Sequence, residues 1–352
     1  MTQSQETPLY VGVDLHERES QLAIFSQEGS LLTEKRIPTA NLESFVGSLP
    51  GEKRIAIEAV GFVYPIYDRL TKVPSCRVSV ADSNNVRLIA KNRLKHDRAD
   101  ARALGELLRT NFLPLAHMAD EETREKKFLI NDRVRYGLRR AQLRAMIRWL
   151  LKRRGIEVKR VFSAEGRKNL RELRLQEIDI RLDELELVES ITERLDQQIS
   201  SIAPTDRGAR LLDTLPGVAP YTALFLSSTI GDVNRFPDSK HLCAYLGLVP
   251  SLHQSGDVLL TGHITKRGNK FLRRNMVEGA RAAVRKDPHL REFYLRIRQK
   301  RGDKKALIAV ARKMVVAYAY WMLKRDKTYE ELLLGKKTED ASLVVVNGER
   351  AS

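Results

Sequence analysis

The sequence contains few of the residues that build disulfide frameworks and cysteine–histidine metal sites. Among 352 residues there are two cysteines, Cys76 and Cys243, and they form no paired motif. The seven histidines are scattered without the spacing of metal ligands. These absences argue against a disulfide scaffold and against a cysteine-rich zinc site. They fit a protein of the reducing cytoplasm.

Long uninterrupted apolar runs are also missing. The chain is polar from Thr2 to Thr7, so no secretory signal is predicted. The most apolar late stretch, ALIAVARKMVVAYAYWML, is interrupted by Arg312 and Lys313. It is typical of a buried helix rather than a membrane span, and we expect no membrane partner.

Positive charge is in excess and unevenly placed. The net charge is +17 and the sequence pI is about 9.9, while 42% hydrophobic residues predict a folded chain of two or three domains. Residues 133–174 carry a net +12, residues 175–199 a net −6, and residues 264–325 a net +15. The excess points to a polyanionic partner, with nucleic acid ahead of an anionic membrane surface, and the alternation suggests separate modules.

The N-terminal part, up to about residue 115, has the pattern of an α/β domain. The runs LYVGVDLH, SQLAIFSQ and LLTEKRIP predict three antiparallel strands, with Glu28-Gly29 in the turn between the last two. A helix over NLESFVGSL, capped by Asn41, precedes the strands KRIAIEAVG and CRVSVAD. Helices from about Asn84 and Asp97 complete the unit. The sequence therefore predicts a mixed sheet whose later strands are reached by helical crossovers.

A helical region follows from about residue 120 to 202. Arg140, Arg144 and Arg148 recur at helical spacing, and the apolar positions opposite them include Leu138, Ala145 and Trp149. An apolar stripe from Leu175 to Ile202 then recurs every three or four residues, which predicts one long helix. That helix can pair in a coiled coil or pack within its own chain, and the pattern does not choose between the two.

A second compact unit is predicted from about residue 209 to 328. In LLDTLPGVAPYTALFLSSTIGDVNRF, Pro216-Gly217 separates two helical stretches, a pattern that looks like a helix–hairpin–helix binding the nucleic-acid backbone. Strands around YLGLVPSLHQSGDVLLTG and a basic helix from about Asn269 follow.

Four acids stand where a metal site could form. Asp14 and Glu58 end two buried-looking strands, where an acid is also common as a loop residue or helix cap. In KHDRADARAL, Asp97 and Asp100 lie three residues apart on one helix face and repel each other unless a cation lies between them. The cations beside them could instead form a plain ion-pair network, and Asp82 competes as a ligand. The basic residues of that segment are Lys95, His96, Arg98 and Arg102.

The order VGVDLH, IAIEAVG, KHDRADARAL resembles the RNase H-like (RuvC-type) domain of the DEDD transposases of the IS110 insertion-sequence family, which includes the pilin-gene-inverting recombinases. The blocks PGV, AYLGLVPS and ITKRGN resemble the C-terminal transposase domain of that family. The resemblance, together with the patterns above, predicts an α/β plus mostly α chain. It has an RNase H-like domain with a mixed sheet at 8–115, basic helices and a coiled-coil segment at 116–205, a mainly helical transposase domain at 206–330, and a flexible tail at 331–352.

The resemblance also implies chemistry. Asp14, Glu58, Asp97 and Asp100 would hold Mg²⁺, with two ions expected. Ser255, in HQSGD, would be the nucleophile, although QSGD is also the pattern of a hairpin turn. The partners implied are donor and target DNA and a bridge RNA that supplies sequence specificity by base pairing. A homo-oligomer, dimer or tetramer, and a prokaryotic cytoplasmic, nucleoid-associated location are expected.

Basic residues complete the predicted site. A phosphate-binding role is expected near the start of the basic helix and along the earlier arginine helix, against the alternative of solvated basic faces. The residues concerned are Arg140, Arg144, Arg148, Lys266, Arg267, Lys270, Arg273 and Arg274. Two other functions remain open: a metal-dependent, junction-resolving nuclease that uses water, and a non-catalytic nucleic-acid-binding protein.

Overall fold

The computed structural model describes residues 7–89, 97–255, 258–266 and 268–334 of the chain. Within these it falls into two compact units, residues 1–118 and 119–352. The first is α/β and the second is mainly helical, as the sequence predicts. The predicted segments 116–205 and 206–330 both lie almost entirely in the second unit, and that finer division stays a prediction.

The first unit is built on a five-stranded mixed sheet in the order β3-β2-β1-β4-β5. β1 pairs antiparallel with β2 and parallel with β4, and β5 is parallel to β4. The strands are β1 (Leu9–Asp14), β2 (Glu19–Phe25), β3 (Leu31–Pro38), β4 (Lys53–Glu58) and β5 (Cys76–Ala81). All five strands and the mixed pairing agree with the prediction from period-two patterning.

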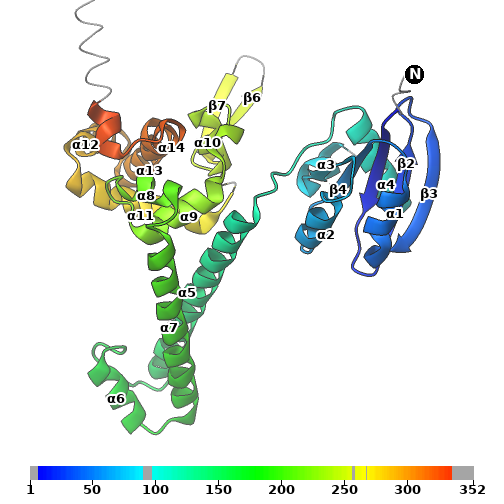
Figure 1. Ribbon diagram of the computed structural model, residues 1–352. Coiled ribbons are helices and arrows are strands. Elements are labelled where there is room, and N and C mark those ends of the chain that lie inside the picture. The colour runs from blue at the N-terminus through cyan, green and yellow to red at the C-terminus, as the bar shows by residue number, and fades with distance from the viewer. Residues whose placement is uncertain (1–6, 90–96, 256–257, 267, 335–352) are drawn as a thin grey trace, which may run out of the picture. The chain divides into compact units, whose positions relative to one another are not determined.

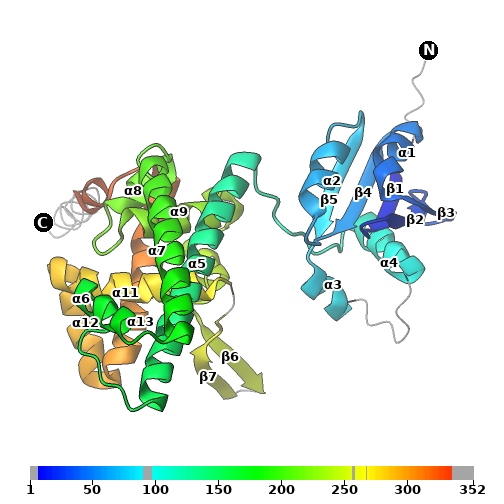
Figure 2. The same ribbon diagram turned by 90° about the horizontal axis from the view of Figure 1, so that it is seen from below.

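Helices cover both faces of this sheet (Figure 2). One face, with Val11, Val13 and Ile57, packs against α1 (Leu42–Ser48) and α2 (Val63–Leu70). The opposite face, with Tyr10 and Ala56, lies under α4 (Asp97–Arg109). α3 (Ser83–Ile89) follows β5. Asn41 occupies the N-cap position of α1, but its side chain makes no capping hydrogen bond.

In the second unit, α5 (Glu121–Arg153) and α7 (Gln176–Ile202) lie side by side as a long helical hairpin (Figure 1). α6 (Ala164–Glu172) lies in the connection at the end of this pair. The apolar stripe of α7 packs within the chain, since Leu182 and Leu185 share a core with Leu143 and Ile147 of α5. A coiled coil between chains is not what buries this stripe. The apolar residues opposite the arginines of α5, Leu138, Ala145 and Trp149, are exposed and do not form the core-facing side of this helix.

The remainder of the second unit is a helical body with one β-hairpin. Its elements are α8 (Arg207–Asp213), α9 (Pro220–Ile230), η2 (Val233–Arg235), α10 (Ser239–Tyr245), β6 (Pro250–Ser255), β7 (Val258–Ile264), α11 (Lys270–Lys286), α12 (Pro288–Arg301), α13 (Asp303–Lys313), η3 (Met314–Ala319) and α14 (Tyr320–Arg325). Of the predicted flexible tail, residues 331–334 are helical and 335–352 lie outside the described residues.

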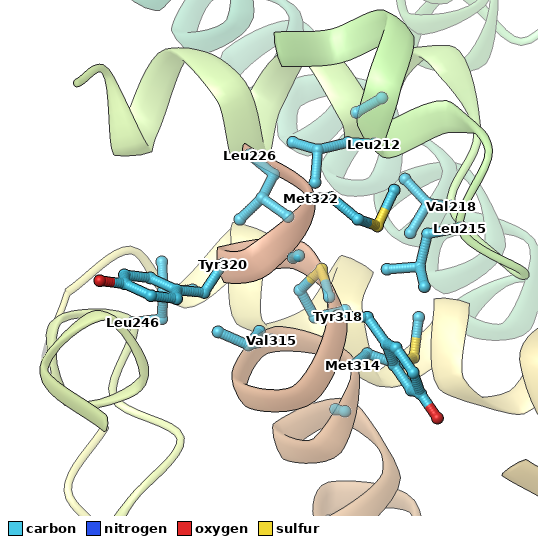
Figure 3. Packing of buried hydrophobic residues seen from close by; sticks show 14 of the residues in the cluster. Leu212, Leu215, Val218, Leu226, Leu246, Met314, Val315, Tyr318, Tyr320 and Met322 are labelled. Carbon is cyan, nitrogen blue, oxygen red and sulfur yellow. The ribbon is translucent and has the colours of Figure 1, made fainter. Parts of the chain in front are cut away.

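The late apolar stretch is a core element, as predicted. The helical run 303–325 is long and apolar enough by composition to cross a membrane, but more than half of it is buried inside the unit. Figure 3 shows Met314, Tyr318 and Met322 in one buried cluster with Leu212 and Leu215. Each fully buried side chain of this kind stabilises the fold by about 1.5–3 kcal/mol.

One smaller expectation about this unit was also met in part. Pro216-Gly217 does separate two helices, α8 and α9. A Cβ added at Gly217 would lie 2.1 Å from the carbonyl oxygen of Gly279 on α11, so close helix packing already explains this glycine. Both cysteines are free, and burial raises the pKa of the Cys243 thiol to about 11.

Candidate active site

Two of the predicted acids end neighbouring parallel strands at the same edge of the first unit's sheet. Val13 of β1 is paired with Ile57 of β4, so Asp14 and Glu58 are the next residues on the two strands. Side chains alternate across a sheet, and Gly12 and Ala56, two residues earlier, lie on the α4 side. Asp14 and Glu58 are therefore expected to project toward α4.

The direction of α4 brings its first turn to this same edge. At its C-terminal end, the Nη1 of Arg109 donates to the carbonyl oxygen of Gln27 at 3.5 Å, in the turn that follows β2. That turn lies at the start of β1, because Phe25 pairs with Tyr10. α4 therefore runs opposite to β1, and its N-terminal turn lies toward the end of the strand that carries Asp14.

A glycine contact seats this helix on the sheet. A Cβ added at Gly12 would lie 1.9 Å from the carbonyl oxygen of Ala101 and 2.4 Å from the amide nitrogen of Gly105. Only glycine lets the two backbones approach this closely. The sequence signal for this contact is a glycine inside a buried strand, which indicates close backbone approach.

Asp97 and Asp100 are positioned by the helix itself. Asp100 precedes Leu104, which is buried against the sheet, by four residues, so it lies on the sheet-facing side of the helix. Asp100 is half-buried, whereas the placement of the Asp97 side chain lies outside the described part of the structure.

One of the cations beside these two aspartates has another partner. Arg102 donates from Nε and Nη2 to both carboxylate oxygens of Glu34 on β3, each at 2.6 Å. Of the other predicted partners, Lys95 and His96 lie outside the described residues. Arg102 is therefore engaged elsewhere and is not available for the ion-pair network that was the alternative to a metal site.

Asp14 has a close neighbour that the sequence analysis missed. It is 7% exposed, and its Oδ2 lies 3.2 Å from Nε2 of His16. The Thr39 hydroxyl donates to the main-chain oxygen of His16 at 2.7 Å, which fixes the loop after β1. A histidine two residues after a strand-end aspartate was the available signal.

The competing acid has another role. The main-chain amide and the side-chain amide of Asn85 donate to Oδ1 and Oδ2 of Asp82, each at 3.2 Å. Asp82 therefore caps the start of α3.

The donor set at this edge has the chemistry that Mg²⁺ prefers, since carboxylate oxygens are its usual protein ligands. The described side chains do not include three His, Cys, Asp or Glu groups close enough to hold one ion. The residues at this edge therefore suit Mg²⁺ in two respects: they offer carboxylate oxygens, and the elements that carry them meet at one edge of the sheet.

Ser255 is the last residue of β6 and is paired with Val258, the first residue of β7. The predicted hairpin is therefore present. Gly256 and Asp257 lie outside the described residues, and the side chain of Ser255 is also outside the described part of the structure. The position at the end of a hairpin suits both interpretations of the QSGD sequence, a turn residue and an exposed nucleophile.

The basic helix begins as predicted. Asn269 caps α11 by accepting hydrogen bonds from the amides of Phe271 and Leu272 at 2.9 and 3.2 Å. Arg273 is partly buried, and its Nη1 donates to the carbonyl oxygen of Gly268 at 3.2 Å, so it supports the preceding loop. Lys266 and Lys270 are exposed, while Arg267 lies outside the described residues.

A cleft joins the two predicted basic segments within the second unit. Its volume is about 580 Å³, and it brings Arg274 of α11 together with arginines of α5. Tyr221 and Phe271 line it as well, which suits contact with bases or sugars beside the phosphates. The cleft arginines are Arg133, Arg140, Arg144, Arg148 and Arg274.

Much of the positive charge on the hairpin is neutralised internally. Arg144 donates to Glu189 of α7 at 2.6 Å, and Arg167 donates to the other oxygen of the same carboxylate at 2.6 Å. Burial would raise the pKa of Glu189, but these hydrogen bonds outweigh it and hold the pKa below its ordinary value. Arg133 pairs likewise with Asp196. The charged runs of opposite sign in the sequence thus face each other.

An acidic edge on an α/β sheet and a basic helical unit together describe a protein built to act on nucleic acid. Comparisons with known proteins agree. Residues 209–295 match the family described as "Transposase IS116/IS110/IS902 family".

The chain is similar to a "Transposase for insertion sequence element IS1111A" of Coxiella burnetii, with 26% identity over 91% of this chain and 90% of the relative. It is also similar to an "Insertion element IS110 uncharacterized 43.6 kDa protein" of Streptomyces coelicolor, with 34% identity over 39% of this chain and 34% of the relative. A "Pilin gene-inverting protein" of Moraxella bovis is 30% identical over 38% of this chain and 42% of the relative. These matches support an IS110-family transposase, with the family's transposase domain at residues 209–295.

Proposed function

We propose that this protein is a DNA transposase that cleaves and rejoins strands at the ends of an insertion sequence and at its target. The relatives, named as transposases and gene-inverting proteins, support DNA recombination as the general activity. One structural observation supports the chemistry: Asp14 and Glu58 end adjacent parallel strands at the edge toward which α4 begins. The strand order and mixed pairing of this sheet also support an RNase H-like fold.

Asp14, Glu58, Asp97 and Asp100 would hold Mg²⁺, with two ions in the proposal. Metal bound there would polarise the scissile phosphate and stabilise developing negative charge. His16, 3.2 Å from Asp14, would hold that carboxylate in place.

Ser255 is proposed as the nucleophile. A bond forms between its hydroxyl oxygen and phosphorus while one phosphorus–oxygen bond of the DNA strand breaks. The seryl proton leaves to a base or to water, and the released DNA hydroxyl takes up a proton. In rejoining, a DNA hydroxyl attacks the phosphoserine and the seryl oxygen leaves. The phosphodiester energy is conserved, so no ATP is required.

A bridge RNA that pairs with donor and target DNA is proposed as the source of sequence specificity. The basic cleft between α5 and α11 supports contact with a nucleic-acid backbone, and Arg140, Arg148 and Arg274 are its natural contacts. Arg144 is a weaker candidate, because it is ion-paired with Glu189. RNA that copurifies with the wild-type protein and is lost from an Arg140→Gln/Arg274→Gln variant would support this role. Binding of donor and target DNA with full selectivity by RNA-free protein would contradict it.

The test is to trap the covalent intermediate. Full-length protein is incubated with Mg²⁺ and end-labelled DNA that carries the element's ends, then denatured and separated by electrophoresis. We expect a protein–DNA adduct that is absent in Ser255→Ala and in Asp14→Asn. Ser251→Ala, which removes a hydroxyl from the same strand, is the matched control and should retain the adduct.

Other outcomes discriminate the alternatives. Continued strand hydrolysis by Ser255→Ala, without an adduct, would favour a nuclease that activates water. Binding that is independent of Mg²⁺, with no cleavage by the wild-type protein, would favour a non-catalytic nucleic-acid-binding protein.

A further inference from the structure

A second basic cavity lies at the base of the β6–β7 hairpin, apart from the residues discussed above. Its volume is about 650 Å³, and it is bounded by the hairpin, α12 and α13. Five cations line it: Arg296, Lys300 and Arg301 from α12, and Lys305 and Arg312 from α13. Among the residues that the structure describes, its lining includes no acidic side chain.

These five cations have no acidic partner within the described part of the chain. All five are exposed, and none forms an ion pair with any residue that the structure describes. Arg144 of α5 and Arg167 of α6 differ from these cations, because both are paired with Glu189. Like charges gathered around a concave surface repel one another, and a bound anion relieves that repulsion.

The floor of the cavity is apolar. Ile264 of β7, Ile297 of α12 and Ile308 of α13 contribute to its lining. A site for a bare inorganic anion has no use for such a floor, whereas the sugar of a nucleotide can pack on it. The volume is within the usual range of ligand sites and suits a short stretch of one strand rather than a whole duplex.

The cavity also continues a basic surface. Leu248, Ile264 and Ile308 line a neighbouring cavity of about 470 Å³ that includes Lys270 and Lys304. That cavity in turn shares Arg274 and Glu278 with the cleft between α5 and α11. The three hollows therefore adjoin one another across the second unit.

We propose that the cavity between the β6–β7 hairpin, α12 and α13 is a binding site for the sugar–phosphate backbone of one nucleic-acid strand. Its five cations contact successive phosphates, and its apolar floor packs against the sugars. The site prolongs the track that begins in the cleft between α5 and α11. The shared chemistry is the phosphodiester backbone, which DNA and RNA both provide. The inference concerns binding alone and stands independently of Ser255 chemistry.

The test compares two charge-matched double variants of the full chain. Lys300→Gln/Lys305→Gln removes two cations of the cavity. Lys286→Gln/Arg298→Gln removes two exposed cations that line none of the three hollows. Binding to duplex DNA, single-stranded DNA and a structured RNA is titrated by fluorescence anisotropy at several salt concentrations. EDTA is present throughout, so that cleavage does not contribute.

Each lost phosphate contact reduces the slope of log affinity against log salt by about 0.9 for a duplex and about 0.7 for a single strand. We expect the cavity variant to lower the slope by about 1.4–1.8 with at least one probe, and the control variant to leave it unchanged. The probe that responds identifies DNA or RNA as the ligand. Unchanged slopes with all probes, or equal losses in both variants, would overturn the proposal. Because the readout is binding, its failure is separate from a failure of the adduct assay.

Discussion

The close contact between Gly12 and α4 gives the sharpest test of how the acidic edge is assembled. In Gly12→Ala, the new Cβ would lie 1.9 Å from the carbonyl oxygen of Ala101, whereas ordinary contacts begin at 3.4 Å. The difference of 3.4 − 1.9 = 1.5 Å is the distance by which strand and helix must separate. Both clashing groups of the helix are backbone atoms, so no side-chain rotation relieves the overlap.

Two effects follow from this displacement. Overpacking of this kind costs about 3 kcal/mol, which lowers the melting temperature of the first unit by roughly 12 °C. A shift of about 1 Å in catalytic groups can reduce a rate by about 100-fold, so DNA cleavage should fall at least that far in protein that remains folded. The reason is that α4 carries Asp97 and Asp100 while β1 carries Asp14.

Scanning calorimetry and strand-cleavage assays measure these effects, and hydrogen exchange locates them in α4. Gly61→Ala is the matched control, because a Cβ there has nothing within 4 Å. It should stay within about 0.5 kcal/mol of wild type and keep full activity. If Gly12→Ala melts and cleaves like Gly61→Ala, α4 does not press on β1 as described and the assembly of the acidic edge is wrong.

The remaining predictions concern stability and assembly of the second unit. Asp206 accepts hydrogen bonds from Lys126 at 2.5 Å and from the Ala209 amide at 2.6 Å. Burial would raise the pKa of Asp206, but these bonds outweigh it and hold the pKa below its ordinary value. Asp206→Asn should therefore lower the free energy of unfolding by about 3 kcal/mol at pH 7. Glu122→Gln is the control, because the Glu122 carboxylate pairs with the same lysine but is 80% exposed. This change should lower the free energy of unfolding by about 0.5 kcal/mol or less. Because the folded pKa is depressed, the Asp206 contribution is present above the unfolded value of about 3.9 and is lost as pH falls through the folded pKa. Urea unfolding should show the gap between wild type and Asp206→Asn closing below about pH 4, and a gap that persists there would contradict the ion-pair explanation. We also propose that the homo-oligomer expected from the sequence uses exposed apolar side chains of α5 and α7, because Trp149 and Leu187 are each 58% exposed. Sedimentation should show dissociation in Leu187→Lys but not in Phe112→Lys, and a monomeric wild type, or unchanged sedimentation of Leu187→Lys, would refute this interface.

The local elements of this protein could be read from its sequence. The strand ending at Asp14 was found as a short run that is apolar on both faces, and the long helix ending at Ile202 was found because its apolar residues recur every three or four positions. Such patterns depend only on neighbours in the chain. The grouping of acids at strand ends was also visible, since chain order and strand position suffice to predict it.

Relations between distant residues were decided by tertiary structure. Arg144 was expected to contact nucleic acid, but it pairs with Glu189, which lies 45 residues further along the chain. The exposure of Trp149 likewise depends on which side of α5 meets α7. No local pattern specifies these partners.

The sequence by itself thus determined the elements, their order and the types of residue available for chemistry. Only the tertiary structure decided that α4 runs back along β1 with its acids at the edge of Asp14 and Glu58. It also decided which cations have no carboxylate partner among residues 7–89, 97–255, 258–266 and 268–334, and Lys300 and Lys305 are two of these. The physical reason is that coulombic pairing and backbone contact depend on distance in space, which the chain acquires only when it folds.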